Sequence, residues 1–378
     1  MMKKITVLGA GLVGSAIIKD LAEEYSITAV DLNQKLLDKL VGVPNVISVQ
    51  ANLREPGKVE ELVADSDLVV SAVPGFMGFE TLKRIIESEK DVVDIAFFPE
   101  EALELDALAK EKGVTVIVDA GVAPGLCNIM AGYLDSQLDQ VNEYLCFVGG
   151  LPKTREWPYE YKAVFSPADV LEEYTRPARY VAYGEEVIRP ALSEVELIDF
   201  PGVGTLEAFN TDGIRSLIRT LDAPFMKEKT LRYPGHTNLM RIFRESGFFS
   251  QKAIEVDGQK VVPLSLTSKL MFKDWELKEG EADFTVMQVD ISGSKGGKKE
   301  KHSFYLLDEY DNEKQVTSMA RTTGYTCSIL ARQVLKGLFS QKGICPPEFV
   351  GRTEGCYEDL ISEYEKRNIL ITETITKE

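Results

Sequence analysis

Short apolar runs alternate with amphipathic stretches along the first third of the chain. Between the runs, apolar residues recur at helical spacing, first at 15–24 and last at 101–111. Strands that are apolar along their whole length are buried on both faces, so this alternation predicts an α/β domain over residues 1–140, a doubly wound parallel sheet of the Rossmann type. The six runs with the length of buried strands lie at 5–8, 27–30, 46–49, 68–73, 92–95 and 114–118.

The hydrophobic pattern changes to period two from about residue 141. The run 253–263 also holds Asp257-Gly258, a hairpin turn signal, at its middle. We therefore expect an inserted α+β domain over residues 141–315 that is mostly antiparallel, with 293–299 as an exposed hairpin loop. Strict alternation of apolar and polar residues is clearest at 142–148, 284–291 and 303–307.

The last part of the chain returns to helical spacing. An amphipathic helix is predicted over 318–335, and it is long enough to pack again on the first domain. We therefore expect residues 316–378 to form C-terminal helices that return to the Rossmann domain.

Composition narrows the class of protein. Hydrophobic residues make up 44% and charged residues 27%, as in ordinary globular proteins. The net charge of −17 would repel nucleic acid, so we expect no nucleic-acid partner, and the charge itself implies nothing about the substrate. No stretch approaches the roughly 20 apolar residues of a membrane span. The apolar N-terminus runs through three glycines into Lys19-Asp20 without a signal-peptide cleavage site, so we expect a cytoplasmic protein.

The chain holds five scattered cysteines and two histidines. No two cysteines form a C-x-x-C pair, which argues against a disulfide framework and against a structural metal site. We expect buried free thiols in a reducing compartment.

The segment that follows the first predicted strand carries the cofactor motif G-x-G-x-x-G. Gly9 permits the tight turn, Gly11 lets the backbone approach a pyrophosphate, and Gly14 lets the helix pack on the strand. Leu12 and Val13 open the helix, whose N-terminus favours an anion. The context of strand, turn and helix predicts a dinucleotide site, and the alternative is a glycine-rich turn without a ligand.

An acidic residue, Asp31, ends the second predicted strand. A carboxylate there can accept both ribose hydroxyls and would repel a 2′-phosphate, which favours NAD over NADP. The alternative is that Asp31 caps the next helix. Other residues at strand ends are expected to contact the cofactor, namely Leu32, Ala72, Val73, Pro74 and Gly121.

Several further segments, together with this fingerprint, resemble the saccharopine dehydrogenase-like family and, within it, the lysine 6-dehydrogenases. The resemblance implies an NAD-dependent enzyme, expected to be a homodimer, that oxidises an amino acid at a carbon bearing nitrogen, with the ε-carbon of L-lysine as first expectation. Alternatives are a saccharopine or opine-type dehydrogenase and a regulatory protein that binds NAD without turnover. These segments are 118–125 with Asn128, 147–150, 192–196, 206–209, 230–236, 320–326 and 346–348.

One segment departs from that family pattern. After the fifth predicted strand the chain reads Phe97-Phe98, where the lysine enzymes are expected to carry glycines. Two bulky rings there are expected to narrow the substrate pocket, which we expect in the cleft between the two domains.

Candidate substrate-side residues follow from the chemistry. Asp119, at the end of the sixth strand, could take a proton from the substrate ammonium, or could instead pair with its own loop. Asp94 has a similar location. A substrate carboxylate needs a cation, for which Arg232 and Arg241 are the candidates. His236 is a candidate proton shuttle because histidine titrates near neutrality, although a histidine satisfied by nearby backbone is the alternative.

Overall fold

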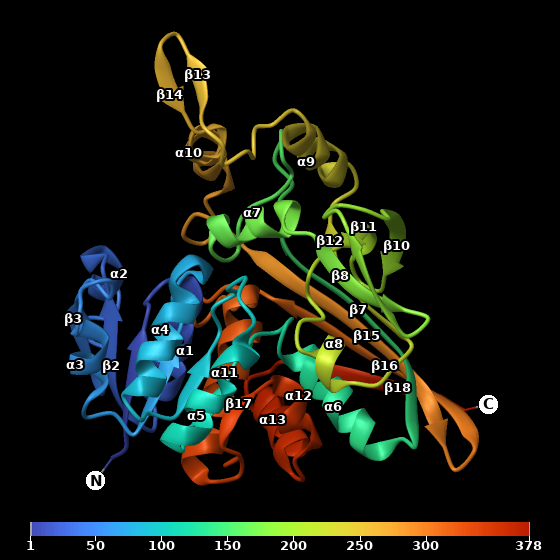
Figure 1. Cartoon of the computed structure of the whole chain (residues 1–378), viewed down its shortest axis with the longest axis horizontal. Helices are drawn as coiled ribbons and strands as arrows, with labels where there is room; N and C mark the ends of the chain where they lie inside the picture. The colour runs from blue at the N-terminus through green and yellow to red at the C-terminus, as the bar shows by residue number, and fades with distance from the viewer. Residues whose placement is uncertain (1, 378) are drawn as a thin grey trace. The chain divides into compact units, whose positions relative to one another are not determined.

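The chain passes three times between two units in a computed structural model, which describes residues 2–377 (Figure 1). The first unit holds the chain up to Leu138 together with Ala320–Ile369. The second holds Asp139–Met319 and the chain from Leu370 onward. None of the helices in residues 2–377 is long and apolar enough to cross a membrane.

The first unit is built on a parallel sheet with strand order β17-β6-β5-β4-β1-β2-β3. All six predicted strands are present, so the doubly wound α/β fold is confirmed. A seventh strand, β17, was not predicted, because three residues leave no periodicity to recognise. The strands are β1 (Lys4–Leu8), β2 (Ser26–Asp31), β3 (Val46–Gln50), β4 (Leu68–Ser71), β5 (Val92–Asp94), β6 (Thr115–Ile117) and β17 (Gly343–Cys345).

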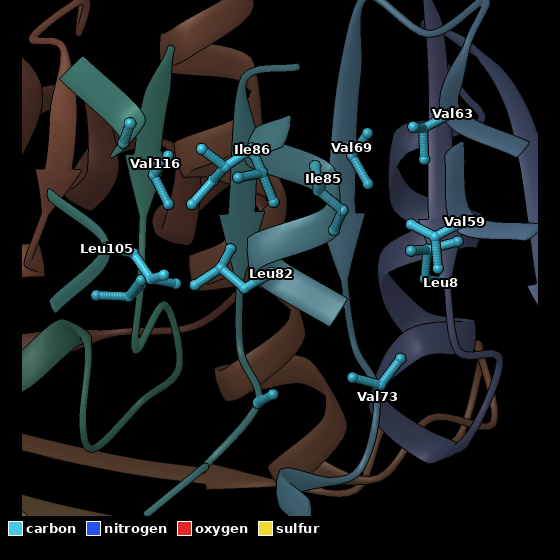
Figure 2. Close-up of a cluster of buried hydrophobic side chains, with 14 of the residues drawn as sticks. Leu8, Val59, Val63, Val69, Val73, Leu82, Ile85, Ile86, Leu105 and Val116 are labelled. Carbon is cyan, nitrogen blue, oxygen red and sulfur yellow. The ribbon is translucent and has the colours of Figure 1, made fainter. Parts of the chain in front are cut away.

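Helices cover this sheet and enclose an apolar core. Figure 2 shows part of that core, where Val69 and Val116 of the sheet meet Leu82, Ile85 and Ile86 of one helix. Five of the six predicted strands are largely buried, as their sequence predicts. The prediction is wrong for β3, which is the last strand of the sheet and has Ile47 64% exposed. The helices of the N-terminal part are α1 (Leu12–Leu21), α2 (Gln34–Asp38), α3 (Lys58–Val63), α4 (Gly75–Glu87), η1 (Ala102–Leu105), α5 (Asp106–Lys112) and α6 (Leu126–Gln137).

Three C-terminal helices complete the first unit: α11 (Ser318–Lys336), α12 (Pro347–Arg352) and α13 (Cys356–Lys366). Helix α11 and the C-terminal end of α13 are held by the buried carboxylate of Asp20 on α1, which pairs with Arg332 and, at 2.8 Å, with Arg367. Helices α6 and α12 also approach closely, since a Cβ on Gly132 would stand 2.0 Å from the Glu348 carbonyl oxygen. Residues distant in sequence are thus part of one core.

The second unit is built on a nine-stranded sheet. Its main path runs β10-β11-β12-β7-β15-β16-β18, with β8 paired to β12 and β9 paired to β8. The sheet is mixed, because β12 pairs with β7 in parallel while the other pairs are antiparallel. Its strands are β7 (Gln140–Pro152), β8 (Ala178–Ala182), β9 (Glu185–Arg189), β10 (Glu196–Phe200), β11 (Gly204–Asn210), β12 (Phe225–Arg232), β15 (Asp283–Lys295), β16 (Lys298–Glu309) and β18 (Ile371–Lys377).

Helices of the second unit surround a core centred on the fully buried Trp275. The predicted hairpin at Asp257-Gly258 is present as a separate two-stranded sheet, β13 (Ile254–Val256) with β14 (Gln259–Val261). The helices are α7 (Pro167–Thr175), α8 (Leu217–Thr220), α9 (His236–Glu245) and α10 (Pro263–Trp275).

Two local predictions need correction. The hairpin predicted at 293–299 is present and exposed around its turn, but β15 and β16 continue into it and only Gly296-Gly297 turns. The prediction of helices to the end of the chain is wrong after Ile369, where the chain forms β18 at the edge of the second sheet. His302 is buried on β16, and its Nδ1 lies 2.6 Å from a Glu373 carboxylate oxygen. The expectation of buried free thiols is confirmed for all five cysteines.

Candidate functional site

The glycine turn of the first unit is shaped by two close backbone contacts. Gly9 has φ +104°, and a Cβ there would lie 2.3 Å from the Ala72 carbonyl oxygen. A Cβ on Gly14 would lie 2.2 Å from the Gly9 carbonyl oxygen. These positions therefore accept only glycine, as the motif predicts.

Gly11 differs from the other two glycines because a Cβ there would meet nothing within 4 Å. It is the N-cap of α1, and no side chain caps that end of the helix. Its smallness serves no internal packing, so it leaves room for something outside the chain. Backbone N–H groups at an uncapped helix start attract an anion such as a pyrophosphate.

Asp31 is fixed beside this turn. Its two carboxylate oxygens accept the N–H groups of Ala10 at 2.8 Å and of Asn33 at 2.7 Å. Helix α2 is capped by Asn33, whose side chain accepts the Lys35 N–H, so capping does not explain Asp31. The contact with Ala10 ties the carboxylate to the glycine turn, where a ribose next to a bound pyrophosphate would lie.

Apolar side chains are exposed at the same carboxyl edge of the sheet. Leu12 is 46% exposed and Leu32 is 66% exposed. Val13, at the start of α1, is half-buried, while Val73 is buried after β4 and Pro74 is the N-cap of α4. This edge offers free N–H groups, a fixed carboxylate and apolar surface, which suits a dinucleotide.

The ends of β5 and β6 bring Asp94, Asp119 and Gly121 together. Asp94 is fully buried and its Oδ1 accepts the Ala96 N–H at 2.9 Å, while its carbonyl accepts the Ala120 N–H. Asp119 is 5% exposed and has φ +51°. Such backbone strain outside glycine is typical of functional turns, although it is not specific to them.

The prediction that Phe97 and Phe98 together narrow a pocket is wrong for Phe98. Phe98 is fully buried and belongs to the apolar core of the first unit, where its ring packs edge-on against Phe79 at 5.8 Å. Gly78 makes room for this ring, because a Cβ there would lie 2.8 Å from it. Phe97 is half-buried.

In the second unit, Arg232 is buried at the end of β12. Its guanidinium pairs with Glu173, lies 4.5 Å from the ring centroid of Tyr161, and donates from Nε to the Tyr174 hydroxyl at 3.1 Å. The cation proposed for a substrate carboxylate thus already has a carboxylate partner within the unit.

His236 completes the same network. Its Nδ1 lies 2.9 Å from the Tyr159 carbonyl, which can only accept, so Nδ1 carries the proton. Its Nε2 therefore accepts from Tyr174. Burial and the nearby Arg232 charge lower the pKa of His236 to about 3. The argument that it titrates near neutrality is wrong, and backbone satisfaction is the better description of this side chain.

Glu207 connects two of the segments that carry the family resemblance. Its carboxylate accepts the N–H of Gly235 at 2.9 Å and the N–H of Thr237, on either side of His236. It thereby satisfies the start of α9 and fixes the histidine. Arg241 lies further along α9 and is exposed, so the structure does not bring it into this network.

Sequence reasoning missed the groups that surround Arg232. Glu173 and Tyr174 come from α7, Tyr161 from the segment before it, and Glu228 from β12. Burial raises the pKa of Glu228 to about 8, and the nearby carboxylates of Glu173 and Asp212 add to the effect. No motif marks these residues, because their contacts join segments that are far apart in the sequence.

Comparison with family models places both units. Residues 5–117 match the saccharopine dehydrogenase NADP binding domain, and residues 121–370 match the saccharopine dehydrogenase C-terminal domain. The chain belongs to the saccharopine dehydrogenase family. The resemblance inferred from sequence segments is thereby confirmed.

Curated relatives of this family member are distant. Mitochondrial alpha-aminoadipic semialdehyde synthase of Mus musculus is 28% identical over 282 residues, which cover 70% of this chain and 30% of that protein. The chain thus spans about a third of that relative. Saccharopine dehydrogenase [NADP(+), L-glutamate-forming] of Saccharomyces cerevisiae is 22% identical, with 92% of this chain and 94% of that protein covered.

A solved structure has the same fold. Apo saccharopine dehydrogenase (L-Glu forming) from Saccharomyces cerevisiae superposes with a TM-score of 0.78 over 99% of this chain and 100% of that chain, at 19% identity. At that identity the likeness supports the α/β fold with its mixed-sheet second unit, and nothing finer.

Proposed function

We propose that this protein is an NAD-dependent dehydrogenase that oxidises an amino acid at a carbon bearing nitrogen, with L-lysine oxidised at its ε-carbon as the first candidate substrate. The observation that carries the proposal is the carboxyl edge of the first sheet, where Gly11 is open and Asp31 is fixed beside it. Membership in the saccharopine dehydrogenase family supports the class of reaction.

The residues of the first unit fit a dinucleotide. The N–H groups at the start of α1 would hold the pyrophosphate, and Asp31 would accept the ribose hydroxyls. Bound NAD would accept the hydride, which is the cofactor's own chemistry. A carboxylate at Asp31 disfavours a 2′-phosphate, so we assign NAD rather than the NADP named for the yeast relative.

The residues on the substrate side are assigned by chemistry. Asp119 is a carboxylate in a turn at the carboxyl end of β6, so it would take the proton that leaves the substrate ammonium. Asp94 would support this group from the neighbouring strand. In the second unit, Arg232 would bind a substrate carboxylate, in exchange for or alongside Glu173.

Saccharopine is the second candidate substrate. Three fungal relatives that this chain covers nearly completely are named saccharopine dehydrogenases, at 21% to 22% identity. A cyanobacterial relative at 21% identity is named carboxyaminopropylagmatine dehydrogenase.

A substrate panel tests the proposal. Purified protein with NAD or NADP is mixed separately with L-lysine, saccharopine and other diamino acids, and NADH or NADPH formation is followed by absorbance. Reduction with lysine supports the first candidate, and reduction with saccharopine alone supports the second. Bound NAD without reduction by any of these would contradict both substrates and favour the regulatory alternative.

Replacement of Asp119 tests the proton role. Asp119→Asn should lower kcat by about 10²- to 10⁴-fold, because the amide cannot take a proton. The affinity for NAD, measured by fluorescence titration, should be nearly unchanged. Asp65→Asn, at an exposed position of the same unit, is the matched control and should retain full turnover. Wild-type turnover in Asp119→Asn would remove this residue from the mechanism.

Replacement of Asp31 tests the cofactor. The double variant Asp31→Ser, Leu32→Arg removes the carboxylate and adds a cation for a 2′-phosphate, so the ratio of kcat/KM for NADP to that for NAD should rise. The variant Leu32→Ser alone is the control. An unchanged ratio in the double variant would contradict the assignment of Asp31 as the residue that favours NAD.

A further inference from the structure

An exposed aromatic side chain stands at the carboxyl edge of the first sheet. Phe76, in the first turn of α4, is 65% exposed. The guanidinium carbon of Arg54 lies 4.9 Å from the centroid of its ring. Neither residue belongs to the glycine motif, and the assignments above do not use them.

The segment that carries Arg54 is braced. Arg84 of α4 donates to the carbonyls of Leu53 at 2.7 Å and of Glu55 at 3.1 Å, on both sides of Arg54. The Leu53 side chain is buried in the apolar core. The position of the Arg54 backbone is therefore set by the fold and not by its stack on Phe76.

The same segment begins beside Asp31. The Ala51 N–H donates to the Asp31 carbonyl at 3.1 Å, and the Gln50 side chain donates to the Leu32 carbonyl at 3.0 Å. The chain from Gln50 to Arg54 thus runs from the end of β2 to the start of α4. Phe76 itself follows Pro74, the N-cap of α4, next to the turn that packs on Gly9.

This arrangement leaves two flat groups ready to stack. Within residues 2–377, Arg54 forms no ion pair, although Glu55 is its chain neighbour. A guanidinium that lies on a ring keeps its opposite planar face for another partner. A single exposed ring is common on protein surfaces; what distinguishes Phe76 is that it carries a stacked guanidinium at the edge of the sheet where Asp31 is fixed.

We infer that Arg54 and Phe76 form the adenine-stacking end of the dinucleotide site. The purine would lie on the free face of the Arg54 guanidinium, with the Phe76 ring behind it and the adenosine ribose toward Asp31. This inference rests on the proposed function only in that the cofactor is a dinucleotide with adenine; it does not depend on which amino acid is oxidised.

Binding of cofactor fragments without substrate tests the inference. Titration calorimetry with NAD, 5′-AMP and nicotinamide mononucleotide is performed on wild type, Arg54→Ala, Arg54→Lys and Phe76→Ala. Loss of a base stack should lower the affinity for NAD and for 5′-AMP by about tenfold in Arg54→Ala, and by less in Phe76→Ala. Nicotinamide mononucleotide lacks adenine, so it should bind to each variant as it does to wild type. Arg54→Lys keeps the charge but not the plane, so it should resemble Arg54→Ala.

The control and the contrary results are distinct. Lys39→Ala removes an exposed cation from the same unit and should leave all three affinities unchanged. Unchanged NAD affinity in Arg54→Ala with lower thermal stability would make the pair a surface contact only and overturn the inference. NADP is titrated in parallel on wild type and Arg54→Ala. A loss of NADP affinity but not of NAD affinity would mean that Arg54 binds the 2′-phosphate, which also overturns stacking. A wild type that binds neither dinucleotide overturns the proposed cofactor as well.

Discussion

The two units present polar groups in opposite ways. In the first unit, the carboxyl edge of the sheet exposes backbone N–H groups at the start of α1 and apolar side chains such as Leu32 and Phe76. In the second unit, charged side chains are buried against one another, with Arg232, Glu173 and Glu228 in one network. The first unit is open for a ligand, whereas the second satisfies its own charges.

This difference explains how each unit tolerates change. In the first unit, backbone N–H groups form the proposed binding site. A side chain at the glycine turn would block access to them, so the glycines are essential there. A buried network depends on every member, because one missing charge leaves its partner desolvated. Substitutions should therefore act mainly on binding in the first unit and mainly on stability in the second, including at Arg232, to which a substrate role is also assigned.

Removal of the buried cation should have the largest effect. Arg232→Met leaves Glu173, whose side chain is only 17% exposed, without its partner, and breaking a buried pair costs about 3–5 kcal/mol of unfolding free energy. Urea denaturation measures the loss. Arg219→Met is the control, because its pair with Glu186 is 57% exposed on the arginine side and should contribute about 0–1 kcal/mol. Equal losses in the two variants would contradict the proposed difference between buried and exposed pairs.

A methyl group at two glycines should separate folding from binding in the first unit. Gly14→Ala places Cβ against the Gly9 carbonyl and should cost about 1–3 kcal/mol of stability. Gly11→Ala meets no protein atom, so it should leave the melting temperature unchanged while it weakens NAD binding. The measurements are thermal unfolding and NAD titration on both variants. A stable Gly14→Ala that binds NAD normally would show that the close approach is not required.

The smallest effect over any one pH unit should be a change in pH dependence. The folded-state pKa of Glu228 is about 8, above its ordinary value of 4.5, so the folded protein retains a proton that the unfolded chain loses. Its contribution to stability is full below about pH 4.5 and falls as pH rises from there to 8, by about 1.4 kcal/mol per pH unit at most. Glu228→Gln should flatten this slope in denaturation curves. Exposed Glu255→Gln should keep the wild-type slope; a wild-type slope in Glu228→Gln would refute the assignment.

The sequence predicts the first unit well because its signals are local. Six strands, their intervening helices and the glycine turn follow from short patterns that tertiary contacts only reinforce. The contacts of Asp31 with Ala10 and Asn33 likewise lie near the motif that predicted them.

The second unit is harder to predict because its contacts are remote. Tyr174 and Arg232 are 58 positions apart, and no spacing rule joins them. His236 looked like a titrating group because its burial cannot be seen in one sequence. The prediction that Phe98 lines the pocket was wrong for the same reason, because burial depends on contacts with other elements. Phe98 packs against Gly78, which belongs to α4.

The ion pairs of Asp20 carry a consequence for the growing chain. Its partners Arg332 and Arg367, like strand β17, are synthesised only after the whole segment 139–319. The first six strands are thus synthesised early, but their unit is not yet complete. The Asp20 carboxylate remains solvated until Arg332 and Arg367 have been synthesised. Domains commonly fold in order from the N-terminus. In this protein, the unit that is synthesised first can complete its folding only after the second unit has been synthesised.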